Sequence, residues 1–594
     1  MTQARRPPRA PRRPSRPGAP RSRRVRDPRR RLVTVGVLVA MVMSLFAGRL
    51  LQLQGVEAAA YAATAEAERL RTVTISATRG AITDTHGIAL ATTVDAVNVT
   101  ADQTQIADPV AVAAALAPVL GEPLKAIQAK LVGDARFAYV AMDISPRRWD
   151  AIAALRLPGI YSEPTSRRVY PQGSLGAALL GFVGSDGRGL DGLEDSWDRQ
   201  LAGKDGQITY ESAAGGRQIP SADSETQESI PGVDVQLTID RDIQFIAERA
   251  IRAKVNESNA DSGTVVAMDP RTGEVLALAT YPSFKPSDPT AAPEANRGNR
   301  AVSEIYEPGS TSKVMTMAAA LDAGAVKPTT KIEVPPVLYR GGDDFNDHTP
   351  HGTLHLTATG VLAQSSNIGT ILIAERLGDE GLYSYLRKFG MGSTSGLDVP
   401  GESAGILPRV DDWGPTNSAT IAFGQGLSLN AVQSTSVFAT IANDGVRVEP
   451  TVVAGTTDPD GSFVPEQPPE RHRVVSAATA KTLRQMMETV VSDQGTAPMA
   501  QIPGYRVAGK TGTAERVDES CGCYRGYTAS FVGFAPADKP AVVVSVTLQD
   551  PKNGRYGGLL GGPVFKRVSS FALQSRQVPP TSKSGPTLRL TYRP

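Results

Sequence analysis

Cysteine is scarce in this chain of 594 residues, which contains only Cys521 and Cys523. Two thiolates cannot complete a four-ligand structural zinc site, so a zinc site built on cysteine alone is excluded. Outside the cytoplasm the two cysteines could form a disulfide, although a bridge across one intervening residue is tight. A small disulfide-closed loop and a pair of free thiols both remain open.

Acidic residues are nearly missing from the first 31 positions, where thirteen arginines accompany one acid, Asp27. The net charge of +3 therefore comes from a local basic segment, and the remaining chain is net acidic. Residues 1–31 are predicted to be a disordered tail, because like charges repel and proline removes helical hydrogen bonds. Such a tail could bind nucleic acid, but the next segment indicates a membrane instead, and no nucleic-acid partner is expected.

Charge is absent from the seventeen residues 32–48. A membrane-spanning helix needs about 20 apolar residues, and residues 32–53 suffice if Arg49 extends toward the lipid headgroups. The positive-inside rule places the arginine-rich tail in the cytoplasm and the rest of the chain outside. A signal peptide cleaved near residues 58–60 is the alternative, but its apolar core would be about 7–15 residues. An uncleaved, single-pass anchor over 32–53 is therefore expected.

The chain is too long for one compact core, so at least two domains are expected. Residues 54–231 alternate short strand-like and alanine-rich helical stretches and are interpreted as an extracytoplasmic pedestal. Residues 232–573 are predicted to form a second domain, and residues 574–594 a polar tail. A β-hairpin is predicted over 262–280, with its turn at residues 269–273. Strands at both ends of this domain, with apolar helices between them, indicate an α/β (α+β) fold in which helices flank a sheet.

The first of three short motifs is Ser310-Thr311-Ser312-Lys313. Proline and glycine precede it, so a helix is expected to begin at Ser310. Positions i and i+3 share a helix face, which brings Lys313 beside Ser310. A lysine whose pKa is lowered by burial or by nearby positive charge can remove the proton of a serine nucleophile. Taken alone, this spacing occurs by chance in many helices.

The second motif is Ser365-Ser366-Asn367. In a catalytic setting Ser365 relays a proton to the leaving amine and Asn367 binds a substrate amide. Taken alone, the motif is more typical of a polar turn that caps a helix.

The third motif is Lys510-Thr511-Gly512-Thr513, which follows strand-like residues and is expected at a sheet edge. Gly512 has no side chain, so a substrate backbone could approach it closely. Lys510 supplies positive charge, and Thr511 and Thr513 can bind a carboxylate. The alternative is a turn before the strand that begins at Tyr527.

Together the motifs resemble the Ser-x-x-Lys, Ser-Asp-Asn and Lys-Thr-Gly set of penicillin-binding proteins and class A β-lactamases, with Ser366 replacing the aspartate. With the predicted anchor, the chain is identified as a class B penicillin-binding protein, a resemblance that extends from about Arg49 to Leu573. Two departures are Ala178, where relatives often have histidine, and Ser312, where phenylalanine is common. Further segments that carry the resemblance are 79–84, 168–173, 192–194, 237–240, 299–301, 306–311, 423–426 and 556–558.

The resemblance implies a penicillin-binding, serine transpeptidase fold: a central antiparallel sheet flanked by helices, after a mixed α/β pedestal and one transmembrane helix. It implies a peptidoglycan D,D-transpeptidase that acts on stem peptides ending in D-Ala-D-Ala, is acylated by β-lactams, and needs no metal or organic cofactor. The implied catalytic residues are Ser310, Lys313, Ser365 and Lys510. The implied substrate-binding residues are Asn367, Thr511, Gly512 and Thr513.

The septal, division-specific subgroup is favoured by the short membrane-proximal module, the Arg/Pro-rich tail and the similarity of the catalytic segments. No glycosyltransferase domain is recognisable, so the family implies a polytopic membrane glycosyltransferase and other division proteins as partners. Alternatives are an elongation-type transpeptidase, a β-lactamase, and a non-catalytic β-lactam sensor or divisome scaffold. The pedestal and anchor argue against a β-lactamase, and the short tail argues against a sensor.

Three histidines, His348, His351 and His355, lie near Asp344 and Asp347. Zinc requires three or four converging ligands. Proline and glycine between the histidines would break a helix that could align them, so a polar loop is the preferred interpretation and no metal site is expected.

Overall fold

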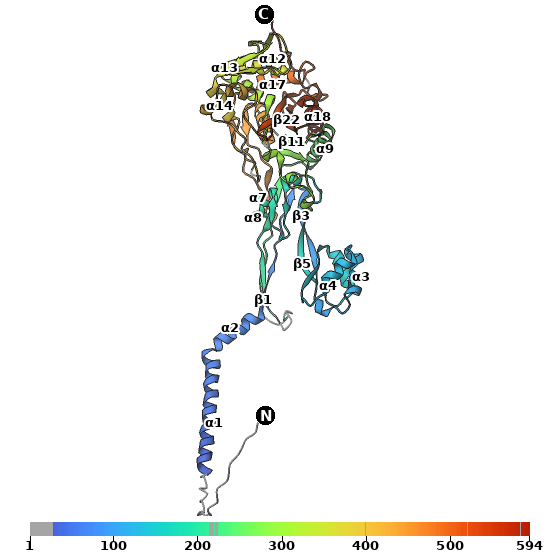
Figure 1. The fold of residues 1–594 in the computed structure, drawn as a ribbon, viewed down its shortest axis with the longest axis vertical. Helices are drawn as coiled ribbons and strands as arrows, with labels where there is room; N and C mark the ends of the chain where they lie inside the picture. Colours follow the sequence, from blue (N-terminus) through green and yellow to red (C-terminus); the bar gives the residue numbers. More distant parts are fainter. Residues whose placement is uncertain are drawn as a thin grey trace, which may run out of the picture. The chain divides into compact units, whose positions relative to one another are not determined.

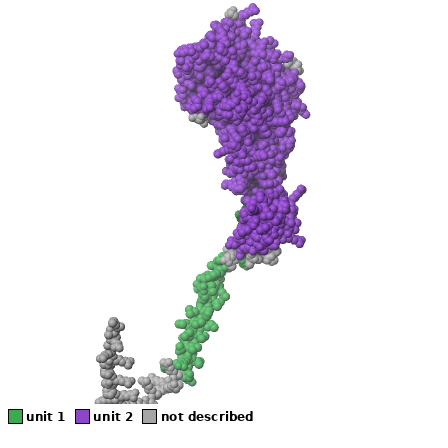
Figure 2. Space-filling view, turned by 45° about the vertical axis from the view of Figure 1, so that its right-hand side comes forward, with its two compact units in different colours: residues 1–74, 207–227 green, residues 75–206, 228–594 purple. Residues whose placement is uncertain are grey.

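The computed structural model describes residues 28–212, 219, 224–397, 399–518, 521–581 and 584–593. The chain divides into two compact units, residues 1–74 with 207–227, and residues 75–206 with 228–594 (Figure 2). Residues 1–27, which make up most of the predicted cytoplasmic tail, lie outside the described residues.

The first unit begins with helix α1 (Pro28–Leu51), which continues into a π-helical turn (Gln52–Val56). Within the described residues, this span is the one helix long and apolar enough to cross a membrane. It begins four residues before the predicted anchor, because the arginines at 29–31 are good helix formers that extend it. Helix α2 (Ala58–Arg69) follows, and then a three-stranded sheet in the order β1 (Leu70–Ile75), β8 (Gly206–Glu211), β9 (Ser224–Gln227).

The pedestal part of the second unit is built on the long strand β3 (Ala89–Ala101). Strands β4 (Ala138–Ile144) and β5 (Ile160–Val169) both pair with it in antiparallel fashion. Three helices supply the core beside these strands, through residues such as Leu116, Ile127 and Ile152. The helices are α3 (Pro109–Leu120), α4 (Leu124–Leu131) and α5 (Pro146–Ala154).

Three pedestal segments singled out in the sequence meet at one buried carboxylate. Glu194 is fully buried, and its two oxygens accept hydrogen bonds from Arg79 Nε at 2.8 Å and Arg168 Nε at 2.7 Å. Arg79 also binds Asp198 at 2.6 Å. Such a cluster holds distant chain segments together, because removing one partner would leave a buried charge unpaired.

Strand β10 (Asp234–Leu237) joins the pedestal to the catalytic part of the molecule. It pairs in parallel with β2 (Ile82–Thr83) of the pedestal and antiparallel with β18 (Val453–Thr457). The resulting seven-stranded sheet has the order β19-β18-β10-β2-β3-β4, where β19 is Phe463–Pro465, with β5 also paired to β3. The predicted boundary at residues 231–232 therefore falls just before a strand that both parts share.

The catalytic part is organised by a five-stranded antiparallel sheet in the order β12-β11-β23-β22-β21. The predicted hairpin is confirmed, and it pairs through β11 with β23, a strand more than 270 residues later in the chain. The strands are β11 (Ser262–Met268), β12 (Val275–Tyr281), β21 (Ala508–Asp518), β22 (Cys523–Ala535) and β23 (Val542–Gln549).

Both faces of this sheet are buried. Alternate residues of a strand point to opposite faces, so neighbouring residues belong to different cores. Val265 of β11 belongs to one core, which α9 (Arg241–Ser258) and α18 (Gly557–Ser575) cover together (Figure 1). Val266 belongs to the other core, with helices that include α11 (Lys313–Asp322) and α16 (Ala431–Ala442). The predicted helix-flanked antiparallel sheet is thus confirmed.

The segment expected to be a polar tail is partly attached to the fold. Helix α18 continues to Ser575, and residues 588–592 lie along β16 (Leu354–Thr357). Thr357 N donates to Leu590 O at 2.9 Å, and Tyr592 N donates to His355 O at 3.0 Å. The alternation of Leu588 and Leu590 with polar residues is the strand-like pattern that explains this attachment.

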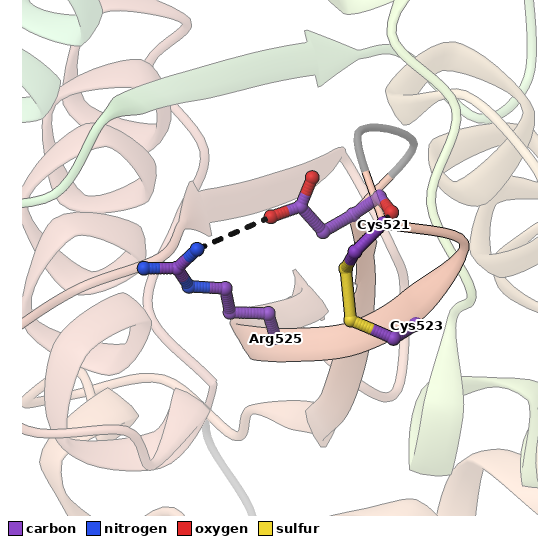
Figure 3. Close-up of a disulfide and its surroundings, with 4 residues drawn as sticks. Cys521, Cys523 and Arg525 are labelled. Carbon is purple, nitrogen blue, oxygen red and sulfur yellow. Dashed lines mark hydrogen bonds and ion pairs between the residues drawn. A yellow bond between two sulfur atoms is a disulfide. The ribbon is translucent and has the colours of Figure 1, made fainter.

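Cys521 and Cys523 form a disulfide at the end of the β21–β22 hairpin (Figure 3). Near it, Arg525 lies 3.9 Å from the carboxylate of Asp518. Of the two alternatives that the sequence left open, the structure contains the disulfide-closed loop.

Candidate active site

Ser310 lies in a short 3-10 turn, Gly309–Ser312, directly before α11. Gly309 has a φ of 51° and donates from its N–H to Gly424 O at 2.9 Å. Gly424 must also be glycine, because a Cβ there would stand 2.0 Å from Gly309 O. The α-helix begins at Lys313, three residues later than the predicted start at Ser310, because a 3-10 turn precedes it. Main-chain contacts of Gly309 fix the turn that carries the hydroxyl.

The Lys313 amine is buried and directed at the second motif. Its Nζ lies 2.6 Å from Ser365 O and 2.7 Å from Asn367 Oδ1, with Ser365 Oγ at 3.4 Å. The Ser310 hydroxyl is half-buried and has no hydrogen-bond partner among the described residues. Burial lowers the pKa of Lys313 to about 7, while the Asp347 carboxylate raises it.

The second motif links two helices. α12 (Ala358–Gln364) is followed by its C-cap Ser365, which has a left-handed φ of 62°, and α13 (Asn367–Leu377) begins two residues after this serine. Ser366 Oγ caps α13 by accepting from Gly369 N at 2.8 Å. The motif is thus a helix-capping turn, and it also presents Ser365 and Asn367 to Lys313.

The third motif lies on β21, the edge strand of the five-stranded sheet, as predicted. Lys510 is fully buried, and its Nζ lies 2.8 Å from Ser365 Oγ and 3.1 Å from Thr511 O. Burial, followed by the positive charge of Lys313, holds the pKa of Lys510 well below its ordinary value. Two buried lysines therefore contact the same serine.

Protein atoms fill the space on the side of Gly512 where a Cβ would point. A Cβ on Gly512 would lie 2.2 Å from Ser530 Oγ, 2.9 Å from Pro308 O and 3.0 Å from Thr311 Cγ2. Glycine is therefore required by the close contact between β21 and the turn that carries Ser310. The approach of a substrate backbone to Gly512 stays a prediction.

The two threonines of the third motif already have partners in the protein. Thr511 Oγ1 lies 2.9 Å from Thr496 Oγ1, and Thr513 Oγ1 lies 3.4 Å from Gly557 N. Alternate positions on a strand share a face, so the two hydroxyls lie on the same side of β21.

The three histidines do not converge. His351 Nε2 lies 3.2 Å from Asp347 Oδ2, the ring of His348 packs against Tyr556, and the ring of His355 packs against Tyr592. Among the described residues there is no group of three or more potential metal ligands.

Sequence reasoning missed two carboxylates near the motifs. Asp347 accepts from Ser366 Oγ at 2.6 Å, and Glu307 accepts from Gly426 N at 2.9 Å and Tyr524 OH at 3.2 Å. Only indirect signals in the sequence point to these two carboxylates. Asp347 lies among the acidic residues considered for a metal site, and Glu307 directly precedes the Pro-Gly of the first motif.

Comparison with known families matches two parts of the chain. Residues 74–237 match the penicillin-binding protein dimerisation domain, and residues 263–570 match the penicillin-binding protein transpeptidase domain. The second match includes all three motifs and both buried lysines.

Relatives match over most of their length. Penicillin-binding protein PbpB of Mycolicibacterium smegmatis is 40% identical over 477 residues, which is 78% of this chain and 74% of the relative. Peptidoglycan D,D-transpeptidase FtsI of Escherichia coli K12 is 32% identical over 551 residues, 91% of each chain. The structure of penicillin-binding protein 3 from Mycobacterium tuberculosis complexed with aztreonam superposes with a TM-score of 0.70 at 34% identity. That superposition covers 88% of this chain and 100% of the other. The chain therefore belongs to the class B penicillin-binding proteins, the peptidoglycan D,D-transpeptidases that join a dimerisation domain to a penicillin-binding transpeptidase domain.

Proposed function

We propose that Ser310 is the acylated nucleophile of this transpeptidase and that Lys313 is its general base. The observation that carries the proposal is the set of contacts around the Lys313 amine. A neutral amine has two N–H donors and one lone pair. Lys313 makes two short hydrogen bonds, to Ser365 O and Asn367 Oδ1, and a longer contact of 3.4 Å to Ser365 Oγ. Its lone pair then remains for the proton of Ser310, three residues earlier on the same side of the turn.

In the first half-reaction, Ser310 Oγ attacks the carbonyl carbon of the penultimate D-Ala of a stem peptide, and its proton passes to Lys313. The backbone N–H groups of Ser310 and Thr513 stabilise the oxyanion, an effect that often provides the largest part of the rate enhancement. Lys510 and Ser365, which are hydrogen-bonded to each other, pass a proton to the departing amine of the terminal D-Ala. The C–N bond breaks and an ester to Ser310 remains.

The remaining substrate contacts follow from the motifs. Asn367 binds a substrate amide, while Thr511, Thr513 and the adjacent Gly512 receive the terminal carboxylate and backbone of the donor. In the second half-reaction, an amino group of another stem peptide attacks the ester and releases Ser310. This step forms the cross-link without a metal or an organic cofactor.

We also propose that α1 anchors the chain with its arginine-rich end in the cytoplasm and both folded domains outside. This orientation puts Ser310 on the side where peptidoglycan lies. A septal role, with a polytopic membrane glycosyltransferase and other division proteins as partners, is supported by the similarity to FtsI and PbpB.

Covalent labelling tests the nucleophile. A fluorescent penicillin should label the wild-type protein and not Ser310→Ala, whereas Ser312→Ala, two residues away in the same turn, should still be labelled. Equal labelling of wild type and Ser310→Ala would contradict the assignment. The lifetime of the acyl-enzyme tests the reaction class: a bond that persists for hours supports a transpeptidase, and release within seconds supports a β-lactamase.

A further inference from the structure

The second motif lacks the aspartate found in the Ser-Asp-Asn pattern, but a carboxylate contacts its central residue. Ser366 is buried, and its Oγ donates to Asp347 Oδ2 at 2.6 Å. Asp347 lies two residues beyond β15 (Asp343–Phe345) and 19 positions before Ser366. The negative charge that the motif itself lacks thus reaches it through a tertiary contact.

The same carboxylate holds the beginning of α13. Asp347 Oδ1 accepts from Ile368 N at 3.0 Å, so the two carboxylate oxygens bind residues on both sides of Asn367. An anion is favoured at this position, because the first N–H groups of a helix are unpaired and carry partial positive charge. Asp347 therefore fixes the backbone of the motif from two sides.

The neighbouring residue orients the amide of Asn367. Asn367 Nδ2 donates to Asn346 O at 3.1 Å, which leaves Oδ1 to accept from Lys313 Nζ at 2.7 Å. Since an amide has donors on one end and an acceptor on the other, this contact sets which end faces the lysine. Residues 346 and 347 together connect the polar loop to the Lys313 amine.

We propose that Asp347 is the positioning residue of the second motif, replacing from a neighbouring loop the carboxylate that Ser366 does not provide. This inference rests on the proposed function of Lys313. Asp347 contacts neither substrate nor Ser310 in the proposed mechanism. It acts by binding Ser366 and Ile368, so that Ser365 and Asn367 keep their hydrogen bonds with the Lys313 amine.

The position of Asp347 has a second effect, which is electrostatic. Its charge opposes the effect of burial and raises the pKa of Lys313. Replacing Asp347 by a neutral residue should therefore make the amine lose its proton at lower pH. A residue with a purely structural role would not change this pH dependence.

The test measures the second-order rate of acylation by a fluorescent penicillin between pH 5.5 and 9, using the full chain in detergent. Asp347→Asn should slow acylation about tenfold or more at pH 8, because a misplaced catalytic group lowers the rate steeply. It should also move the acidic limb of the profile to lower pH by about 1 unit, the lower end of the effect of a neighbouring opposite charge. Ser366→Ala, which removes the hydrogen bond to Asp347 and the cap on Gly369 N but keeps the carboxylate charge, should slow acylation without moving the acidic limb.

Two other ionisable side chains lie close by, His351 in direct contact with Asp347 and Lys510 beside Lys313. The profiles are therefore repeated in a His351→Gln background, where the shift caused by Asp347→Asn should persist. Asp347→Glu keeps the charge, and its limb should stay at the wild-type position even if the rate falls. If Asp347→Asn does not fold, Asp347→Glu still tests whether the position of the carboxylate affects the rate of acylation.

The proposal would be overturned if the acidic limb of the pH profile of folded Asp347→Asn coincided with that of the wild type. It would also be overturned if the acidic limb of Asp347→Glu were displaced from the wild-type position. A wild-type rate in Asp347→Asn would overturn it as well. Failure of the wild-type protein to be acylated would instead contradict the proposed function, so the two failures are distinguishable.

Discussion

Lys510 Nζ lies 2.8 Å from Ser365 Oγ, although 145 positions separate the two residues in the chain. The carbonyl oxygen of the same serine accepts from Lys313. Two buried amines that share one serine cannot both carry charge without a large desolvation cost. Burial lowers the pKa of both amines, and the positive charge of Lys313 lowers that of Lys510 further, so at most one of the two is expected to carry a charge near neutral pH.

The first prediction concerns pH. Because Lys313 acts as a base only when neutral, and burial lowers its pKa to about 7, acylation of Ser310 should rise as pH increases through 7 and level off above it. Stopped-flow acylation by a chromogenic cephalosporin, at constant ionic strength, measures the profile. Lys313→Arg stays charged throughout, so it should lose the limb together with about 10²–10⁴-fold of the rate. A wild-type limb near pH 10 would contradict the assignment of the base.

The second prediction concerns Gly512. Gly512→Ala should destabilise the protein by about 1–3 kcal/mol, because the methyl group would overlap Ser530 Oγ and Pro308 O. Displacement of the Ser310 turn should also slow acylation about 10- to 100-fold. Thermal melting and acylation kinetics measure the two effects.

Gly298→Ala is the matched control, because a Cβ there meets nothing within 4 Å. It should leave stability and acylation close to wild type. Ser530→Ala combined with Gly512→Ala removes the nearest contact but not Pro308 O, so it should restore part of the loss. A fully active Gly512→Ala protein would show that acylation does not depend on the close contact between β21 and the turn that carries Ser310.

The third prediction concerns the buried cluster of the pedestal. Glu194→Gln should cost about 3–5 kcal/mol of unfolding free energy, because Arg79 and Arg168 would both lose their buried carboxylate partner. Chemical denaturation followed by circular dichroism measures the change. Glu122→Gln provides the control: its partly exposed pair with Lys130 should be worth less than about 1 kcal/mol. Equal effects of the two substitutions would show that the cluster contributes little.

The sequence predicts the main elements of this fold because local pattern and long-range packing agree there. The hairpin at 262–280 and the edge position of the Lys510 strand follow from alternation and turn residues. The pairing of β11 with β23 is consistent with the predicted sheet, but its register depends on tertiary packing that no short window contains. The attachment of residues 588–592 was missed because proline and polar residues nearby concealed a short alternating segment.

The site was predictable in its residue types and less so in its contacts. Spacing placed Lys313 near Ser310, whereas the structure shows its amine bonded to Ser365 and Asn367. Chain separation hides such contacts, and it also hid the role of Asp347, which acts on a motif 19 positions away. Sequence patterns could not place Pro308 and Ser530 beside Gly512, and these contacts give a second reason for glycine there, while the expected approach of a substrate backbone stays a prediction.

Strand β10 has a mechanical consequence. β10 is hydrogen-bonded to β2 of the pedestal on one side and to β18 of the catalytic part on the other. The pedestal and the catalytic part are therefore not free to rotate about residues 231–232 without breaking these hydrogen bonds. Three residues after β10, Asp240 caps α9, the helix that lies against the catalytic sheet, so the strand shared with the pedestal leads directly into that sheet's core. Within this unit the pedestal and the catalytic part therefore share main-chain hydrogen bonds and are not joined by a linker alone.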